Sequence, residues 1–197
     1  MSKELIQKAR KLAQEIVAPI TESVDKEGRF PKEAYDALKK QGFMGLLVPK
    51  EFGGLGFSII EHTGVCYELA RKDATTGLCY MMHNTGTSGI VSFGSAAMKD
   101  EFLPKIAKGE RAIALAYSES GSGTHFGSPD ISESLENGVR VLNGRKSFVT
   151  SALQADFYMT NTNSCKIKGA HNTWLVDRTL PNMIHEDSAW DGLGMRG

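Results

Sequence analysis

Apolar side chains recur every three or four residues through the first half of the chain. Between residues 5 and 16 the repeat follows one helical face, which predicts an amphipathic helix. Ser2 is placed to cap its N-terminus, and Pro19 is expected to end it. The same spacing predicts three further helices: one between Pro31 and Gly42, one over residues 58–72 and one over residues 74–92.

A proline interrupts the last helical pattern of this half. Ser95 can cap a helix that runs to about Leu103, and Pro104 can restart a short helix that ends at Gly109. Because a proline inside a helix costs about 3 kcal/mol, we expect a break at Pro104.

The pattern changes from helical to strand-like after residue 110. Residues 112–117 form a short continuous apolar run, which predicts a buried strand. Val139 and Val141 alternate with polar residues. The pairs Asn137-Gly138 and Asn143-Gly144 on either side of them are hairpin signals. Two more strands are predicted, over residues 156–160 and over residues 173–176.

This change divides the chain into two expected domains and gives an α+β multidomain fold class. Residues 1–111 form an all-α N-terminal domain, and residues 112–197 form a middle β domain. A few strands cannot easily close a barrel or cover both faces of a sheet. The β domain is therefore expected to be an incomplete barrel or sandwich, completed by another chain or by a longer natural sequence.

Composition narrows the class of protein. The chain has 197 residues, of which 41% are hydrophobic and 23% charged, as in ordinary globular proteins. Its 23 basic and 23 acidic residues cancel, which argues against nucleic-acid binding. No apolar run approaches the roughly 20 residues that span a bilayer, and the N-terminus lacks a signal-peptide pattern. We expect a cytoplasmic protein that does not insert into membranes, although a processed organellar matrix protein would look the same.

Several motif matches carry little weight. Residues 192–197 fit G-x-G-x-x-G, but no helix follows them to receive a pyrophosphate. Ser118, His125 and Asp130 are the residue types of a hydrolase triad, yet the G-x-S-x-G elbow is missing. The histidines show no metal-ligand spacing, so no metal site is expected, and His83 is interpreted as a hydrogen-bonded histidine at a helix interface. Free thiols are expected at Cys66, Cys79 and Cys165.

Two clusters of hydrogen-bond donors follow apolar runs in the second half. Residues 118–124 follow the first run, and residues 147–151 end the second. Such clusters suit a planar ligand with polar edges that lies across strand ends. Ordinary strand capping and turn formation would also account for them.

Five segments, taken in order, resemble landmarks of the acyl-CoA dehydrogenase family. They are Ser92-Phe93-Gly94-Ser95 ("fGt"), residues 102–110 ("yLPklasGe"), residues 118–125 (T-E-P-x-x-G-S-D), residues 143–150 ("nGxKxWIT") and residues 194–197 ("GmRgS"). The upstream run 68–73, with His83 ten residues further on, is similarly placed.

The resemblance implies FAD as cofactor and an acyl-CoA thioester as substrate. By this resemblance Ser118 faces the pyrimidine edge of the flavin, Phe148 packs beside the ring, and Thr150 lies near N5. The implied cofactor-binding residues are Leu115, Tyr117, Ser118, Gly123, Phe148, Val149 and Thr150. Thr124 is the implied substrate contact.

In this family a carboxylate in a second helical bundle abstracts the α-proton while hydride leaves the β-carbon. No residue of this chain is expected to be catalytic, so the chain is interpreted as a fragment that is inactive alone and binds FAD weakly or not at all. Glu119 and Lys146 are interpreted as structural partners. An electron-transfer flavoprotein is the implied acceptor, and the parent enzyme is expected to be a homodimer or homotetramer.

Four positions depart from the family pattern. They are Ser120 for proline, His125 for aspartate, Phe148 for tryptophan and Ser151 for asparagine. These changes bear on the acyl-CoA contacts, and the sequence does not specify acyl chain length or branching. Two other readings stay open: an oxidase or flavin monooxygenase on the same fold, and a non-catalytic short subunit or assembly module.

Overall fold

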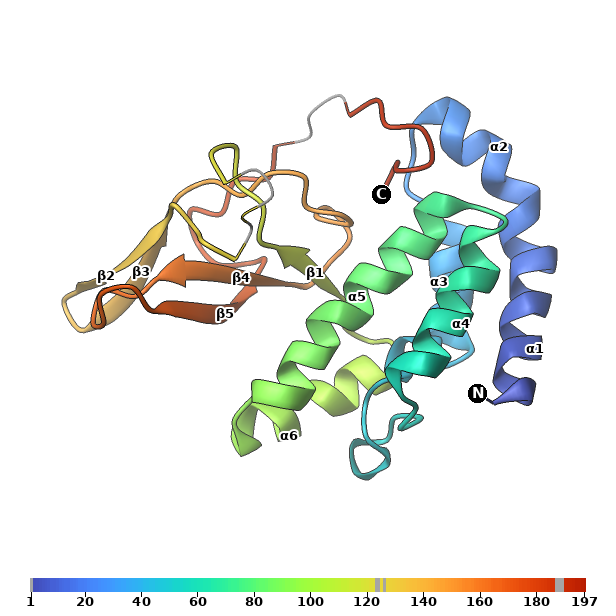
Figure 1. Cartoon of the computed structure of the whole chain (residues 1–197), viewed down its shortest axis with the longest axis horizontal. Coiled ribbons are helices and arrows are strands. Elements are labelled where there is room, and N and C mark those ends of the chain that lie inside the picture. The colour runs from blue at the N-terminus through green and yellow to red at the C-terminus, as the bar shows by residue number, and fades with distance from the viewer. Residues whose placement is uncertain (1, 123–124, 126, 187–189) are drawn as a thin grey trace. The chain divides into compact units, whose positions relative to one another are not determined.

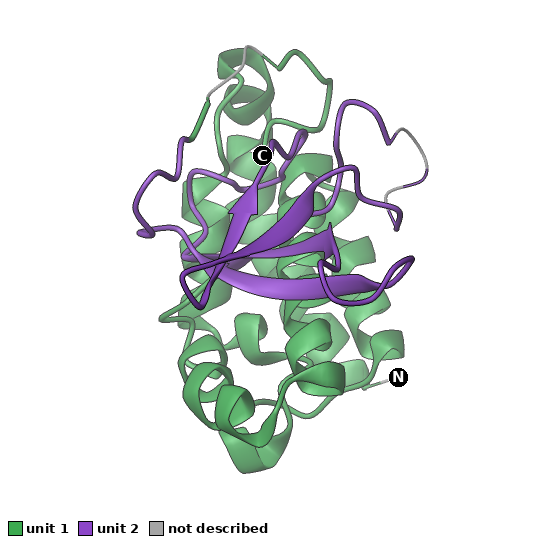
Figure 2. Ribbon diagram, turned by 90° about the vertical axis from the view of Figure 1, so that its left-hand side faces the viewer, with its two compact units in different colours: residues 1–112, 185–197 green, residues 113–184 purple. Residues whose placement is uncertain are grey.

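The computed structural model describes residues 2–122, 125, 127–186 and 190–197. The chain forms two compact units (Figure 2). The helical unit comprises Met1–Ala112 together with His185–Gly197, and the sheet unit comprises Ile113–Ile184. The chain therefore leaves the helical unit, forms the sheet unit and returns.

Among the described residues, six α-helices form most of the helical unit (Figure 1). They are α1 (Lys3–Leu12), α2 (Ala18–Glu27), α3 (Lys32–Lys40), α4 (Ile59–Ala70), α5 (Ala74–Phe93) and α6 (Ala96–Ala107). Short 3-10 turns cover Phe43–Gly45 and Lys50–Phe52, and a π-helical turn covers Ala13–Val17. The helices predicted before residue 93 are thus confirmed in type and place, except at Pro19.

Side chains cap four of these helices as their local sequence requires. Ser2, Asp73 and Ser95 each accept a hydrogen bond from a backbone N–H of the following first turn. Ser58 and Glu61 form a capping box at the start of α4. These oxygens satisfy N–H groups that have no partner within the helix. Helix starts are therefore set by residues close by in the sequence.

The expectation that Pro19 ends the first helix is wrong. The chain continues from α1 through the π-helical turn Ala13–Val17, which comes before Pro19. In this turn the N–H of Ala18 donates to the carbonyl of Ala13. Pro19 then lies in the first turn of α2, where a missing N–H costs little. The helix ends instead at Gly28, whose φ of 63° is left-handed.

The expected break at Pro104 is also wrong, since α6 continues through it to Ala107. Leu103 and Ile106, on either side of Pro104, are both 0% exposed. Burying each such side chain contributes about 1.5–3 kcal/mol, which offsets the cost of about 3 kcal/mol for the proline. Packing therefore overrides the local preference.

The core of the helical unit includes one titratable side chain of note. Apolar residues from α1, α3, α4 and α5 form this core, among them Leu12, Leu38 and Leu69. His83 of α5 is fully buried, and its Nε2 lies 3.1 Å from the carbonyl oxygen of Met44. Burial lowers the pKa of His83 to about 4, so the neutral ring donates this hydrogen bond. The interpretation of His83 as a helix-interface histidine is confirmed.

The sheet unit is a mixed sheet of five strands that the described residues leave open. The strands are β1 (Ile113–Ala116), β2 (Ser132–Glu136), β3 (Val139–Asn143), β4 (Phe157–Asn163) and β5 (His171–Asp177). β4 pairs in parallel with β1 and antiparallel with β5, and its last residue, Asn163, is paired in parallel with Ser132 of β2. A helical unit followed by an incomplete β unit is the fold class that the sequence indicates.

The two hairpin signals have different outcomes. Asn137 and Gly138 have φ values of 50° and 83° and join the antiparallel strands β2 and β3, as predicted. Asn143-Gly144 forms no hairpin, because β3 ends at Asn143 and the chain leaves the sheet. A Cβ on Gly144 would lie 2.0 Å from Cγ2 of Ile131, so this glycine permits a close approach of two segments.

None of the helices in the described part of the chain is both long and apolar enough to cross a membrane. As expected, Cys66, Cys79 and Cys165 form no disulfide bond within the described residues. Burial raises the pKa of Cys66 to about 12, so this thiol stays protonated.

Candidate functional site: two joined loops of the sheet unit

The predicted donor clusters lie side by side in the sheet unit. β1 consists of small and apolar residues buried against β4, and the hydroxyl of Thr160 donates to the carbonyl of Ala116 at 2.7 Å. The chain then leaves the sheet as residues 117–119. The N–H of Ser147 donates to the carbonyl of Ser118 at 2.8 Å, so residues 146–147 lie against this first loop.

Lys146 lies at the centre of this junction. Its ammonium donates to Oε1 of Glu119 at 2.5 Å, to Oδ1 of Asn161 at 2.9 Å and to the carbonyl of Tyr117 at 3.3 Å. An ammonium has three N–H donors, so all three are used. The side chains of Lys146 and Glu119 are only 11% and 4% exposed. Removing one member of such a buried pair costs about 3–5 kcal/mol, because the other charge is left uncompensated.

The second carboxylate oxygen of Glu119 reaches a third segment. Oε2 accepts hydrogen bonds from the N–H of Asp130 at 2.7 Å and from that of Ile131 at 3.3 Å. The carboxylate thus contacts one ammonium and two N–H groups. Both of its oxygens are occupied by partners within the sheet unit, so it is poorly placed to take a proton from a substrate.

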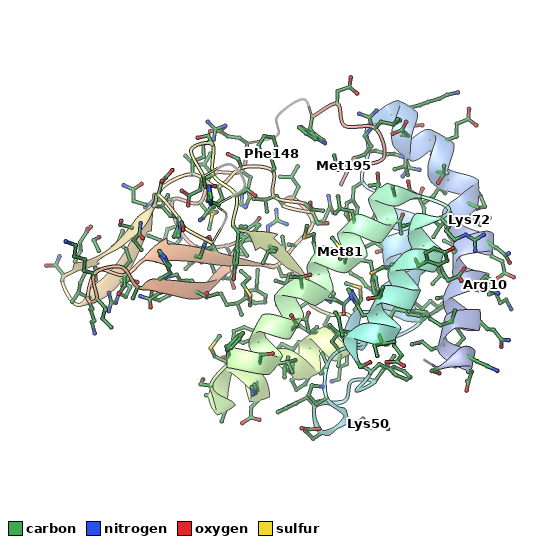
Figure 3. The ribbon with its side chains drawn as sticks, in the orientation of Figure 1. Arg10, Lys50, Lys72, Met81, Phe148 and Met195 are labelled. Carbon is green, nitrogen blue, oxygen red and sulfur yellow. The ribbon has the colours of Figure 1, made fainter. Side chains whose placement is uncertain are left out.

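The loop after Ser147 holds two residues in left-handed backbone conformations. Phe148, which Figure 3 labels, lies in this loop. Its φ is 55° and its side chain is 73% exposed. Ser151 has a φ of 63° and is buried, and its Oγ has no hydrogen-bond partner among the described residues. Such conformations are costly for residues other than glycine and often mark functional loops. Val149, between them, packs against the small apolar cluster around Ala114 and Tyr158.

The hydroxyl of Tyr158 supports the end of this loop. It donates to the carbonyl of Ala152 at 2.6 Å, and burial raises its pKa. The phenol therefore stays neutral and remains a donor. It ties the loop that begins at Phe148 to β4.

The structure locates most of the predicted site residues. Leu115 lies in β1 and is half-buried, opposite Met159 of β4. Tyr117 and Ser118 form the first loop, and Phe148, Val149 and Thr150 directly follow the Ser147 contact. Gly123 and Thr124 lie outside the described residues.

Sequence reasoning missed Asn161, Asp130 and Ile131 as parts of this junction. Asn161 is 4% exposed in the middle of β4, whose other residues are largely apolar or hydroxyl-bearing. A polar residue inside a buried strand needs a partner, which was the available signal. Asp130 and Ile131 contribute only backbone N–H groups, which leave no trace in the sequence.

Within the described ranges, no three His, Cys, Asp or Glu side chains are gathered so that they could hold a metal ion. The site instead offers hydroxyl groups, backbone donors and an exposed aromatic ring. Such a donor set suits an organic ligand with a planar ring better than a metal.

The chain thus combines a helical unit with an open mixed sheet, and two loops are hydrogen-bonded to each other beside the strands. The chain belongs to the acyl-CoA dehydrogenase family, because residues 2–110 match the family model described as "Acyl-CoA dehydrogenase, N-terminal domain".

A curated relative agrees with this family, and solved structures share the fold. An acyl-CoA dehydrogenase of Bacillus subtilis is 31% identical over 175 residues, which are 87% of this chain and 46% of the relative. Butyryl-CoA dehydrogenase from Megasphaera elsdenii has a similar fold, with a TM-score of 0.84 and 24% identity over 92% of this chain and 50% of that one. The structure of an acyl-CoA dehydrogenase from Bacillus anthracis in complex with FAD also has a similar fold, with a TM-score of 0.81 and 24% identity. The match covers 90% of this chain and 30% of that one. The chain spans about half the length of the curated relatives that it matches.

Proposed function

We propose that this chain provides the helical unit and the cofactor-holding loops of an FAD-dependent acyl-CoA dehydrogenase. The proposed reaction is α,β-dehydrogenation of an acyl-CoA thioester. The observation that carries the proposal is the hydrogen bond from Ser147 to Ser118, which brings together the two loops that the family landmarks single out. The family match over residues 2–110 supports the same assignment.

The residues of these loops fit an isoalloxazine ring. Ser118 and Thr150 bring hydroxyl donors, and Phe148 exposes a flat apolar surface. The buried hydroxyl of Ser151 has no partner within the part of the chain that the structure describes. We propose that FAD is held by Leu115, Tyr117, Ser118, Phe148, Val149 and Thr150, with Gly123 in the segment outside the described residues. When bound, FAD would supply the acceptor for the hydride that leaves the substrate.

The proposed role of the chain's own residues is to bind and orient. Fixed donors of the Ser118 loop would hold the polar edge of the ring, where negative charge develops on reduction. The Thr150 hydroxyl would orient the ring, and Phe148 would keep water from one side of it. Thr124 is the proposed contact for the acyl-CoA chain.

Proton abstraction is proposed to fall to a carboxylate outside residues 1–197. Both oxygens of Glu119 are hydrogen-bonded, to Lys146 and to two backbone N–H groups, so Glu119 is not placed to act on a substrate. The relatives are about twice as long as this chain, which leaves room for the base and for contacts between subunits of a homodimer or homotetramer. An electron-transfer flavoprotein is the proposed acceptor of the electrons.

The test compares this 197-residue chain with the product of the complete reading frame that contains it. We expect the complete product to bind FAD and its flavin absorbance to bleach when an acyl-CoA is added without oxygen. The 197-residue chain should show no bleaching. The substitutions Ser118→Ala and Thr150→Val in the complete product should weaken FAD binding. Ser134→Ala, which removes a hydroxyl from β2 of the same unit, is the control. A complete product that holds no flavin, or equal losses in all three variants, would contradict the proposal.

A further inference from the structure

We infer that Glu119 and Lys146 are positioning residues that set the spacing between the two cofactor-holding loops. This inference rests on the proposed function, because the loops matter only if they hold the flavin. The contacts themselves can be tested without any cofactor.

The pair joins four segments that are distant in the sequence. Lys146, after β3, contacts the first loop at Tyr117 and Glu119 and contacts β4 at Asn161. Glu119 extends this connection to the chain just before β2 through the N–H groups of Asp130 and Ile131. The Lys146 ammonium and the Glu119 carboxylate each have several partners within the sheet unit. The pair therefore fixes the distances between these segments and leaves no charge available for a ligand.

The balance of charge decides between a positioning role and an electrostatic one. A lone ammonium near a flavin would stabilise the anionic reduced form. Lys146 is instead paired with Glu119, and the two side chains are only 11% and 4% exposed. The pair carries no net charge, so its main effect on a nearby ring is through the placement of other donors.

The proposed flavin contacts are close to the pair along the chain. Ser118 directly precedes Glu119, whereas Phe148 and Thr150 follow Lys146 by two and four residues. Consecutive Cα atoms are about 3.8 Å apart, so a displacement of Glu119 or Lys146 also displaces the proposed flavin contacts beside it. The hydrogen bond from Ser147 to Ser118 couples the two loops directly.

The first test measures amide hydrogen exchange in the 197-residue chain without FAD. The variants are Glu119→Gln and Lys146→Met, singly and together. Amide exchange at Asp130, Ile131 and Ser147 should become about tenfold faster in each single variant. The reason is that each substitution weakens the hydrogen bonds that hold these segments together. The double variant should be no worse than the poorer single variant, because the two residues act as one unit.

A second buried pair in the same unit provides the matched control. Arg140 lies 2.8 Å from Oε1 of Glu133, and their side chains are 26% and 0% exposed. This pair links β2 to β3. Among the described residues it has no hydrogen bond to residues 117–119 or 146–151. The variants Glu133→Gln and Arg140→Met should leave exchange at Ser147 unchanged. Equal effects of both pairs on Ser147 would overturn the inference.

A variant that unfolds the whole sheet would call for a gentler change. Lys146→Arg keeps the charge, but a planar guanidinium cannot match the three acceptors around a tetrahedral ammonium. Faster exchange at Ser147 in this variant supports the inference, and unchanged exchange overturns it.

The second readout is the FAD dissociation constant of the complete reading-frame product, followed by flavin fluorescence. It should rise about tenfold in Lys146→Met and stay unchanged in Arg140→Met. If the parent product binds no FAD, the proposed function fails. The exchange result then still decides whether the pair spaces the loops.

Discussion

The guanidinium Nε of Arg196 lies 3.1 Å from Oδ1 of Asp25, although 171 positions separate the two residues. The same carboxylate oxygen accepts the N–H of Gly194 at 3.1 Å, and the N–H of Arg196 donates to Oγ1 of Thr75 at 3.0 Å. The motif at residues 194–197 is therefore fastened to α2 and to the N-terminus of α5, within the helical unit.

Removing this carboxylate should release the end of the segment. We predict faster amide exchange at Gly194 and Arg196 in Asp25→Ala. Asp191→Ala is the control, because Asp191 also contacts Arg196 at 2.7 Å but its side chain is 95% exposed, and exposed pairs contribute little. The N–H of Gly194, and then the Arg196 guanidinium, lower the pKa of Asp25. Protonation at acid pH, as the pH falls through this lowered pKa, should therefore have the same effect as the substitution. Equal effects of the two variants would show that Asp25 is not the anchor.

His83 should make stability depend on pH in a defined window. Its pKa is about 4 in the folded chain and about 6.5 when unfolded, so the unfolded state binds the proton more readily. The neutral ring of His83 therefore contributes about 3 kcal/mol to the free energy of unfolding above about pH 6.5. This contribution is lost as the pH falls toward about 4.

Urea unfolding of the chain and of His83→Gln between pH 7.5 and 4.5 checks this prediction. The variant should lose less stability over that range. Burial also lowers the pKa of His62, so some dependence should persist, and His62→Gln measures that share. The prediction fails if the wild type and His83→Gln show parallel pH profiles.

A methyl group at Gly144 should disturb the junction of the two loops. Its Cβ would lie 2.0 Å from Cγ2 and 2.7 Å from Cβ of Ile131, whose N–H donates to Glu119. We predict that Gly144→Ala lowers the free energy of unfolding by about 1–3 kcal/mol. Gly127→Ala, in open space in the same unit, should change it by less than about 0.5 kcal/mol. Denaturant unfolding compares the two variants, and similar values would refute the close approach.

Replacing Pro104 should stabilise the helical unit. An alanine restores an N–H inside α6 and removes the clash of the proline ring with the preceding turn of the helix. Pro104→Ala should therefore raise the free energy of unfolding by up to about 3 kcal/mol. Lys105→Ala, the next residue of the same helix, tests for a general effect of alanine. A less stable Pro104→Ala variant would mean that packing of the ring outweighs its backbone cost.

The sequence by itself determined the elements whose cause is local. Helix starts follow from Ser2, Ser58, Asp73 and Ser95, whose side chains bond to N–H groups two or three residues away. The β2–β3 hairpin follows from Asn137-Gly138, because that turn needs two left-handed residues. The order of the polar segments along the chain indicated the family and singled out Ser118 and Thr150.

Tertiary structure decided the features that depend on distant partners. Pro104 stays inside a helix because Leu103 and Ile106 are buried by other elements, which no local rule can foresee. Asn161 and the N–H groups of Asp130 and Ile131 join the Glu119–Lys146 pair only once the sheet has formed. Local hydrogen bonds involve short loops with little entropy to lose, so they can be inferred from spacing. A buried charge pair exists only where several segments exclude water together, and only the folded chain shows where that happens.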